Sequence, residues 1–237
     1  MGEDCLSTID CFRKMGVEIN ITDDEVIVEG VGLHGLEAPS EALDTGNSGT
    51  TTRLLCGILA GQPFTVTMSG DPSIQKRPMG RVMKPLREMG ASIEGKNDNF
   101  CPLTLFPSEL HGIEYRLPVA SAQLKSAILL AGLYAEGQTT VIEPAPSRDH
   151  TERMFRALGV EIETSGSTIT LDPPEDLHAV DIAVPGDISS AAFFLVAGAI
   201  IPGSELTIKT WASIRPARAF WTFCATWVRT SPSRLPR

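Results

Sequence analysis

The 237-residue sequence has few cysteines, no long apolar run and little basic charge, and each shortage narrows the class of protein. Its five cysteines are odd in number and scattered, without the spacing of a disulfide framework or a metal site. We therefore expect reduced, buried thiols, no metal and no other cofactor. The longest apolar run, Ala191–Ile201, is too short to cross a bilayer, so no membrane partner is expected. The acidic start, Met1 to Asp4, lacks a signal-peptide pattern, which predicts a cytoplasmic protein.

Basic residues are also scarce: 20 Lys and Arg stand against 29 Asp and Glu, a net charge of −9. This balance argues against nucleic acid as a partner, because a polyanion is bound through an excess of Lys and Arg. An acidic protein binds anionic metabolites only through a local cluster of Arg, Lys and backbone N–H groups. Such a cluster has to be found in particular motifs.

An internal repeat is the main architectural signal. The segment Cys11–Ile19 recurs as Pro85–Ile93 and again as Met154–Ile162. Each copy has the pattern of a helix end, a glycine just after it and then an alternating strand. Between the copies lies a second repeated element, a buried Ala/Leu-rich helix that is followed by a glycine and a short strand.

Together these elements predict an α/β protein made of repeated strand–helix–strand–helix–strand–strand (βαβαββ) units. One unit cannot hide both faces of its helices, so we expect several units to pack around shared, parallel buried helices at about 50–60, 124–135 and 189–200. The N-termini of these helices would then meet at one end. Converging helix N-termini form a pocket for anions.

The first of these helix starts, Asn47–Arg53, carries the clearest binding signal. Small residues at a helix start leave backbone N–H groups bare, and bare N–H groups hold anions. Gly46 and Gly49 let the backbone turn tightly and approach a ligand. Arg53 could add a fixed charge and a bidentate donor. The alternative is an ordinary Ser/Thr cap on a buried helix.

The other two helix starts are less specific. Ser121 and Gln123 bring a hydroxyl and an amide that suit hydroxyl or phosphate oxygens, although Ser121 alone is equally typical of a helix cap. Asp187, at the third start, is expected to be a cap.

Two connecting segments supply cations near these starts. The loop from Gly70 to Gly80 holds Arg77 between prolines and glycines, and such a frame suits an arginine that grips a carboxylate or phosphate in one orientation. Ser147 and Arg148 precede a short helix that Asp149 is expected to cap. Arg148 could then reach outward to a phosphate.

Five motifs in this order resemble the bacterial 5-enolpyruvylshikimate-3-phosphate synthases. They are Gly46–Arg53, Lys76–Arg81 with Pro85–Gly90, Ala120–Ala127, Ser147–Glu152 and Pro185–Ala191. The resemblance covers about residues 2–209. It implies transfer of the enolpyruvyl group from phosphoenolpyruvate to the 5-hydroxyl of shikimate 3-phosphate with release of phosphate, a step of chorismate and aromatic amino-acid biosynthesis. It also implies an inside-out α/β barrel of two domains, with the site in the cleft between them.

The resemblance also implies which residues bind the two small anionic substrates. The residues similar to the shikimate 3-phosphate contacts are Ser121, Ala122 (through its backbone), Gln123, Ser147 and Arg148. The residues similar to the phosphoenolpyruvate or glyphosate side are Asn47, Gly49, Thr50, Arg77 and again Gln123. Some glyphosate-tolerant relatives have alanine where this chain has Gly49, so this position is typical of a sensitive enzyme.

The expected domain organisation is incomplete at both ends. A first domain at 1–183 would contain a partial unit at 1–38 and full units at 39–107 and 108–176, and a second domain would begin at 184–209. The family's Lys-Ser-x-Ser-x-Arg segment near the N-terminus has no counterpart here. Residues 210–237 hold all three tryptophans and no acidic residue, and reading a family-like Asn-Val-Gly-Leu-Asn-Pro segment one base out of frame reproduces residues 210–214. We therefore interpret residues 210–237 as an out-of-frame tail.

The family's catalytic residues are expected in the second domain, so we predict no turnover by these 237 residues alone. Two other functions remain open at this point. One is the sister enzyme that acts on UDP-N-acetylglucosamine, although its reactive loop cysteine has no counterpart between Gly70 and Gly80. The other is a ligand-binding module without catalysis.

Overall fold

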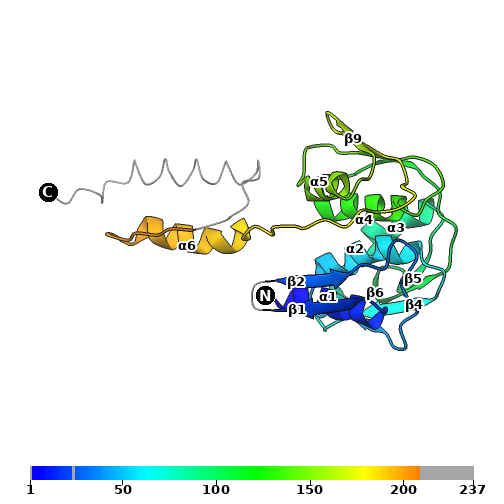
Figure 1. Cartoon of the computed structure of the whole chain (residues 1–237), viewed down its shortest axis with the longest axis horizontal. Coiled ribbons are helices and arrows are strands. Elements are labelled where there is room, and N and C mark those ends of the chain that lie inside the picture. Colours follow the sequence, from blue (N-terminus) through cyan, green and yellow to red (C-terminus); the bar gives the residue numbers. More distant parts are fainter. Residues whose placement is uncertain (1, 23–24, 209–237) are drawn as a thin grey trace. The chain divides into compact units, whose positions relative to one another are not determined.

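A computed structural model describes residues 2–22 and 25–208, and the chain divides after Val180 into two units (Figure 1). The first unit contains the repeated elements and the second contains a single described helix. The interpretation of residues 210–237 as an out-of-frame tail falls outside the described residues and stays a prediction.

The order of elements in the first unit repeats as the sequence predicts. The chain opens with one helix and two strands: α1 (Glu3–Lys14), β1 (Glu18–Ile21) and β2 (Val26–Glu29). The βαβαββ unit then follows as β3 (Leu43–Asp44), α2 (Gly49–Ala60), β4 (Val66–Ser69), α3 (Gly80–Glu88), β5 (Ser92–Lys96) and β6 (Phe100–Phe106), with a short 3₁₀ turn, η1 (Ile74–Lys76). The same unit recurs as β7 (Glu114–Arg116), α4 (Ala122–Gly132), β8 (Thr139–Ile142), α5 (His150–Ala157), β9 (Ile162–Ser165) and β10 (Thr168–Leu171).

The two complete units build sheets of identical topology. The strand orders are β3-β4-β6-β5 and β7-β8-β10-β9, and in each sheet the first pair is parallel and the other two pairs are antiparallel. β1 and β2 form a separate antiparallel pair. The structure therefore confirms an α/β fold of repeated βαβαββ units.

Helices α2 and α4 pack against each other in the interior of the first unit (Figure 1). Most residues of both helices are buried, because sheets and helices cover them on several sides. A Cβ on Gly57 would lie 2.2 Å from the carbonyl oxygen of Ala127, so the close approach of the two helices requires glycine there. This contact sets α2 and α4 at a fixed spacing.

The repeated helix ends are structural features. The glycine after each helix has a positive φ, +87°, +102° and +87° at Gly16, Gly90 and Gly159, as the sequence predicts. The repeated arginine before each glycine donates to the carbonyl oxygen of the strand that follows: Arg13 to Ile19, Arg87 to Ile93 and Arg156 to Ile162. These three guanidinium groups therefore fix each helix to its strand.

The second unit contributes α6 (Ile188–Ile200), whose cap is confirmed. The Asp187 carboxylate accepts hydrogen bonds from the backbone N–H groups of Ser189 and Ser190, each at 3.0 Å. In the described part of the chain, no helix is long and apolar enough to cross a membrane.

The expectation of buried thiols holds for Cys11, Cys56 and Cys101, which are free and buried, whereas Cys224 lies outside the described residues. It is wrong for Cys5, which is exposed because it lies in the first turn of α1, on a helix whose only fully buried residue is Cys11.

Candidate functional site

The start of α2 is held by its own side chains. Ser48 is the N-cap, and its hydroxyl oxygen accepts from the Thr51 backbone N–H at 3.1 Å. The cap predicted as the alternative reading of this motif is therefore present. It leaves Gly49 and Thr50 in the first turn, where backbone N–H groups have no partner within the helix.

Arg53 lies one turn further along α2 and is only 9% exposed. Its guanidinium donates to the Gly49 carbonyl oxygen at 3.1 Å, to Gln123 Oε1 at 3.2 Å and to the Pro78 carbonyl oxygen at 3.3 Å. Burial lowers the pKa of Arg53, and the positive charges of Arg81 and Arg77 lower it further. Arg53 therefore joins α2, α4 and the loop that carries Arg77.

The first turns of α2 and α4 meet, as predicted. Gln123, in the first turn of α4, donates from Nε2 to Thr50 Oγ1 at 2.8 Å while its Oε1 accepts from Arg53. Two of the three expected helix starts thus converge in the first unit. The third, at α6, belongs to the second unit, and its part in the pocket stays a prediction.

The loop before α3 presents Arg77 beside Gly49. Asp71 orders this loop by accepting from the backbone N–H groups of Ser73 and Ile74 at 2.8 and 2.9 Å, and these bonds, that to Ile74 first, hold the pKa of Asp71 below its usual value. A Cβ on Gly49 would lie 2.7 Å from Nη1 of Arg53 and 3.0 Å from Nη1 of Arg77. The absence of a side chain at Gly49 therefore makes room for two guanidinium groups.

These guanidinium groups form no direct salt bridges, although Arg77 is near enough to Asp71 for its charge to lower the pKa of that carboxyl further. Among the described residues, no carboxylate oxygen lies within 4.0 Å of a nitrogen of Arg53, Arg77 or Arg81. Clustered cations without a direct salt-bridge partner repel one another and attract an anion.

A pocket of about 430 Å³ opens at this place. Its lining includes all four residues assigned by resemblance to the phosphoenolpyruvate side alone, together with three others: Asn47, Ser48, Gly49, Thr50, Arg77, Glu3 and Asp4. The sequence analysis did not identify Glu3 and Asp4 as part of the site. The sequence showed only that Glu3 and Asp4 are suited to the first turn of a helix, because the positive end of the helix dipole favours carboxylates.

At the start of α4, Ser121 is the N-cap, with its oxygen 3.4 Å from the Leu124 backbone nitrogen. A hydroxyl that accepts a hydrogen bond still has its own proton to donate. The capping and binding readings of Ser121 are therefore compatible. Ala122 and Gln123 follow in the first turn, where backbone N–H groups are free of helix partners.

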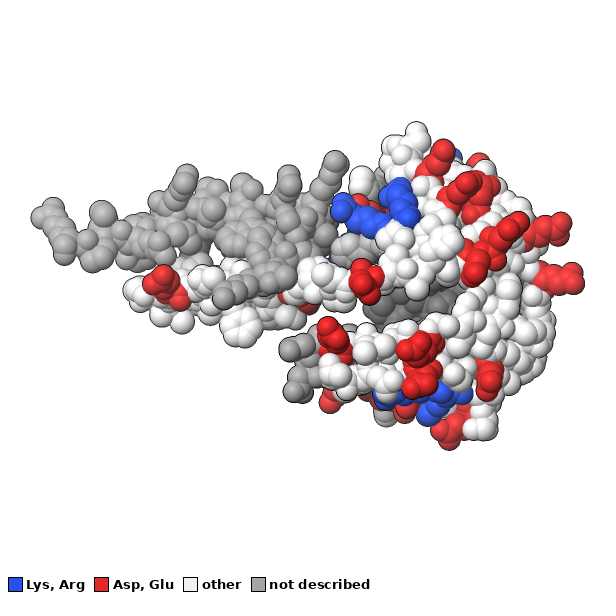
Figure 2. Space-filling model, in the orientation of Figure 1, with Lys and Arg blue, Asp and Glu red and all other residues white. Residues whose placement is uncertain are grey.

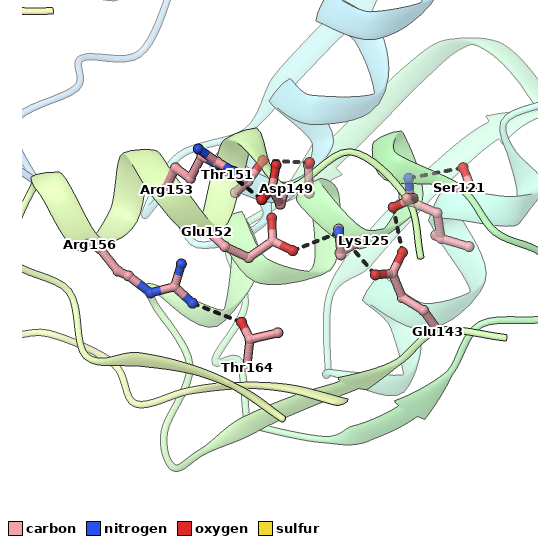
Figure 3. Close-up of polar contacts among 12 residues, drawn as sticks. Ser121, Lys125, Glu143, Asp149, Thr151, Glu152, Arg153, Arg156 and Thr164 are labelled. Atoms are coloured by element: carbon pink, nitrogen blue, oxygen red, sulfur yellow. Dashed lines mark hydrogen bonds and ion pairs between the residues drawn. The ribbon is translucent and has the colours of Figure 1, made fainter. Parts of the chain in front are cut away.

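Behind these residues lies a buried cluster of charges that the sequence analysis missed (Figure 3). Lys125 Nζ is 2.6 Å from Glu152 Oε1 and 3.1 Å from Glu143 Oε2, and the three side chains are 1%, 3% and 6% exposed. Lys125 belongs to α4, Glu143 follows β8 and Glu152 lies in the first turn of α5. The sequence did show a lysine within the apolar pattern of α4. A buried lysine needs a partner of opposite charge, but sequence spacing does not reveal which residue that is.

Ser147 and Arg148 precede α5, as predicted. The Ser147 hydroxyl donates to Glu143 Oε1, and Arg148 is exposed. The predicted side-chain cap by Asp149 is wrong: Asp149 occupies the N-cap position, but its carboxylate accepts from Arg153 Nε at 2.9 Å and makes no capping bond. The exposed guanidinium of Arg153 competes successfully with the backbone for this carboxylate.

The wider surface offers little positive charge. In Figure 2, acidic side chains are scattered over the visible face, whereas Lys and Arg appear in few places, in keeping with the net charge of −9. Attraction of an anion therefore depends on the helix starts and the guanidinium groups beside them.

Comparison with known proteins gives a consistent result. A family model described as EPSP synthase (3-phosphoshikimate 1-carboxyvinyltransferase) matches residues 1–228. The 3-phosphoshikimate 1-carboxyvinyltransferases of Geobacillus thermodenitrificans and Shouchella clausii are 59% and 57% identical to the chain over 218 and 219 residues, 92% of this chain and 50% and 51% of theirs. EPSP synthase from Acinetobacter baumannii has a similar structure, with a TM-score of 0.83 and 51% identity over 91% of this chain and 49% of that one.

The chain thus spans about half the length of the curated relatives it matches. The match to the family model runs through both complete βαβαββ units and includes every residue of the candidate site. On these findings, the chain belongs to the EPSP synthase family.

Proposed function

We propose that this chain provides the part of an enolpyruvyl transferase that binds shikimate 3-phosphate and contributes residues to the phosphoenolpyruvate site. The reaction moves the enolpyruvyl group of phosphoenolpyruvate to the 5-hydroxyl of shikimate 3-phosphate and releases phosphate. The names of the relatives support this reaction. The observation that carries the proposal is the meeting of the first turns of α2 and α4 through Gln123, beside guanidinium groups that form no salt bridge with a described carboxylate.

Shikimate 3-phosphate would bind at the start of α4. The hydroxyl of Ser121, the backbone N–H of Ala122 and the amide of Gln123 are donors suited to its hydroxyl and phosphate oxygens. Ser147 and Arg148 would bind from the segment before α5, where the exposed guanidinium can pair bidentately with a phosphate.

Phosphoenolpyruvate, or glyphosate in its place, would occupy the pocket at the start of α2. Arg77 supplies the charge there, and Asn47, Gly49 and Thr50 supply polar side-chain and backbone groups. Gln123 bonds to Thr50 and belongs to the start of α4, so it would lie between the two substrates. A residue in that place can fix their relative orientation, which is a large part of catalysing a two-substrate reaction.

A ligand titration tests the proposal. The isotope-labelled 237-residue chain is titrated with shikimate 3-phosphate and, separately, with UDP-N-acetylglucosamine, and amide chemical shifts are followed by NMR. We expect a saturable response to shikimate 3-phosphate and none to UDP-N-acetylglucosamine. In Arg148→Ala the affinity for shikimate 3-phosphate should fall about tenfold or more, because a hydrogen bond to a charged group contributes about 1.5–3 kcal/mol. Lys84→Ala, which removes an exposed charge outside the site, is the matched control.

A response to UDP-N-acetylglucosamine alone would instead favour the sister enzyme. Unchanged affinity in Arg148→Ala would remove Arg148 from the site. No response to shikimate 3-phosphate would refute the proposed ligand.

A further inference from the structure

Three buried charged side chains, Lys125, Glu143 and Glu152, join the elements that carry the proposed ligand residues; we call them the ionic clasp (Figure 3). We propose that the ionic clasp holds the segment from Pro144 to Asp149 against the start of α4, which makes Lys125 a positioning residue for the phosphate of shikimate 3-phosphate. This inference rests on the proposed function for its ligand.

The contacts run directly from the helix to the segment. Lys125 stands two residues after Gln123 in α4, and its ammonium contacts Glu143 at 3.1 Å. The other carboxylate oxygen of Glu143 accepts from the Ser147 hydroxyl. Two successive polar contacts therefore connect α4 with the segment that carries Ser147 and Arg148.

The second end of the segment is tied to the same ammonium. Glu152, in the first turn of α5, contacts Lys125 at 2.6 Å, and Ser126 and Thr151 share a hydrogen bond of 2.6 Å beside it. The segment between these ties contains no helix or strand residue. Its position relative to α4 therefore depends on side chains, and Lys125 binds on both sides of it.

The composition of the ionic clasp is costly for a purely structural cluster. One ammonium and two carboxylates are more than nine-tenths buried, and Glu152 Oε2 has no hydrogen-bond partner among the described residues. Apolar side chains of similar volume often stabilise a fold as well as such a buried ion cluster does. Apolar side chains could not accept the hydrogen bond from the Ser147 hydroxyl. That bond fixes the position of the segment, and a segment that binds a ligand needs a fixed position.

The experiment separates positioning from stability. In Lys125→Met/Glu143→Leu/Glu152→Leu, the clasp is replaced by apolar groups in the full 237-residue chain. The matched control is Lys14→Met/Asp10→Asn/Glu41→Gln, which removes a surface lysine that also bridges two carboxylates, at 3.2 and 3.0 Å. Each protein is unfolded in urea, titrated with shikimate 3-phosphate, and examined for backbone order at Ser147 and Arg148 by heteronuclear NOE.

We expect the clasp variant to unfold cooperatively but to bind shikimate 3-phosphate at least about tenfold more weakly, a difference of about 1.4 kcal/mol at 25 °C. Its NOE values at Ser147 and Arg148 should fall, and the control should match the unmodified chain. If the triple variant does not fold, Glu143→Leu alone keeps the balanced Lys125–Glu152 pair and should show the same loss of affinity.

A folded clasp variant that binds like the unmodified chain, with equal order at Ser147 and Arg148, would overturn the inference. If the unmodified chain itself does not bind shikimate 3-phosphate, the proposed function fails. The positioning claim is then decided by the NOE values of the ligand-free proteins, and equal values in both would overturn it.

Discussion

The substitution Gly49→Ala is a direct test of how tightly the start of α2 is packed around its arginines. A Cβ there would lie 2.7 Å from Nη1 of Arg53, closer than real Cβ atoms approach, and 3.0 Å from Nη1 of Arg77. The end of a free side chain would move away at little cost. Arg53 is not free, because it is almost buried and bonded to the Gly49, Gln123 and Pro78 oxygens.

The magnitude follows from two opposing effects. Alanine is favoured over glycine in a helix by up to about 1 kcal/mol, which would stabilise the variant. Displacing the buried guanidinium loses one or more hydrogen bonds of a charged group, each contributing about 1.5–3 kcal/mol. We therefore expect a net loss of about 1–2 kcal/mol in the free energy of unfolding for Gly49→Ala.

Urea unfolding followed by far-UV circular dichroism measures this loss. Gly30→Ala is the control, because a Cβ on Gly30 meets no atom within 4 Å and the backbone there is not left-handed. Its effect should stay within about 0.5 kcal/mol, as for other exposed substitutions. A Gly49→Ala variant as stable as the unmodified chain would show that Arg53 is free to move and would refute the packing argument.

Two further predictions concern the first unit. Ser48→Ala removes the N-cap of α2 and should lower the free energy of unfolding by about 1 kcal/mol in the same assay; no change would mean that water replaces the cap. Burial raises the pKa of Tyr134 to about 12 and also raises that of Tyr115, so in the folded chain each phenol keeps its proton to a higher pH than an exposed tyrosine, whose pKa is about 10. The stability they contribute is complete below pH 10 and should fall as the pH rises toward 12, more steeply than in Tyr134→Phe. An absorbance showing half or more of the two tyrosines as phenolate in the folded chain at pH 10 would contradict this.

Much of the fold is predictable from the sequence because it repeats. The glycines at 16, 90 and 159 mark the same helix end three times, and periodicity assigns the elements on either side. The meeting of α2 and α4 also follows, since two equivalent buried helices of a repeat begin at the same end of their units. The residues that the resemblance assigns to the pocket around Gly49 are therefore near one another for an architectural reason.

The repeat does not predict which of several possible partners a charged side chain contacts. Glu143 and Glu152 are 18 and 27 positions after Lys125, and nothing in that spacing shows that they share one ammonium. Asp149 has the sequence signature of a cap but binds Arg153, because two acceptable partners lie within its reach. Local sequence specifies which groups are present, and packing decides which of the alternatives forms.

The proposed anion site and the buried core of this chain have the same origin. Beyond their first turns, the N–H groups of α2 and α4 bond to carbonyl oxygens within the helix, so only the N–H groups of the first turns are free for a ligand. Gly57 brings the two helices together, and Gln123 joins their starts. Arg53 adds a charge that is held in place before any ligand arrives, so binding does not have to order it. The proposed binding of an anion by a chain of net charge −9 would thus depend on attraction that is concentrated where two core helices begin.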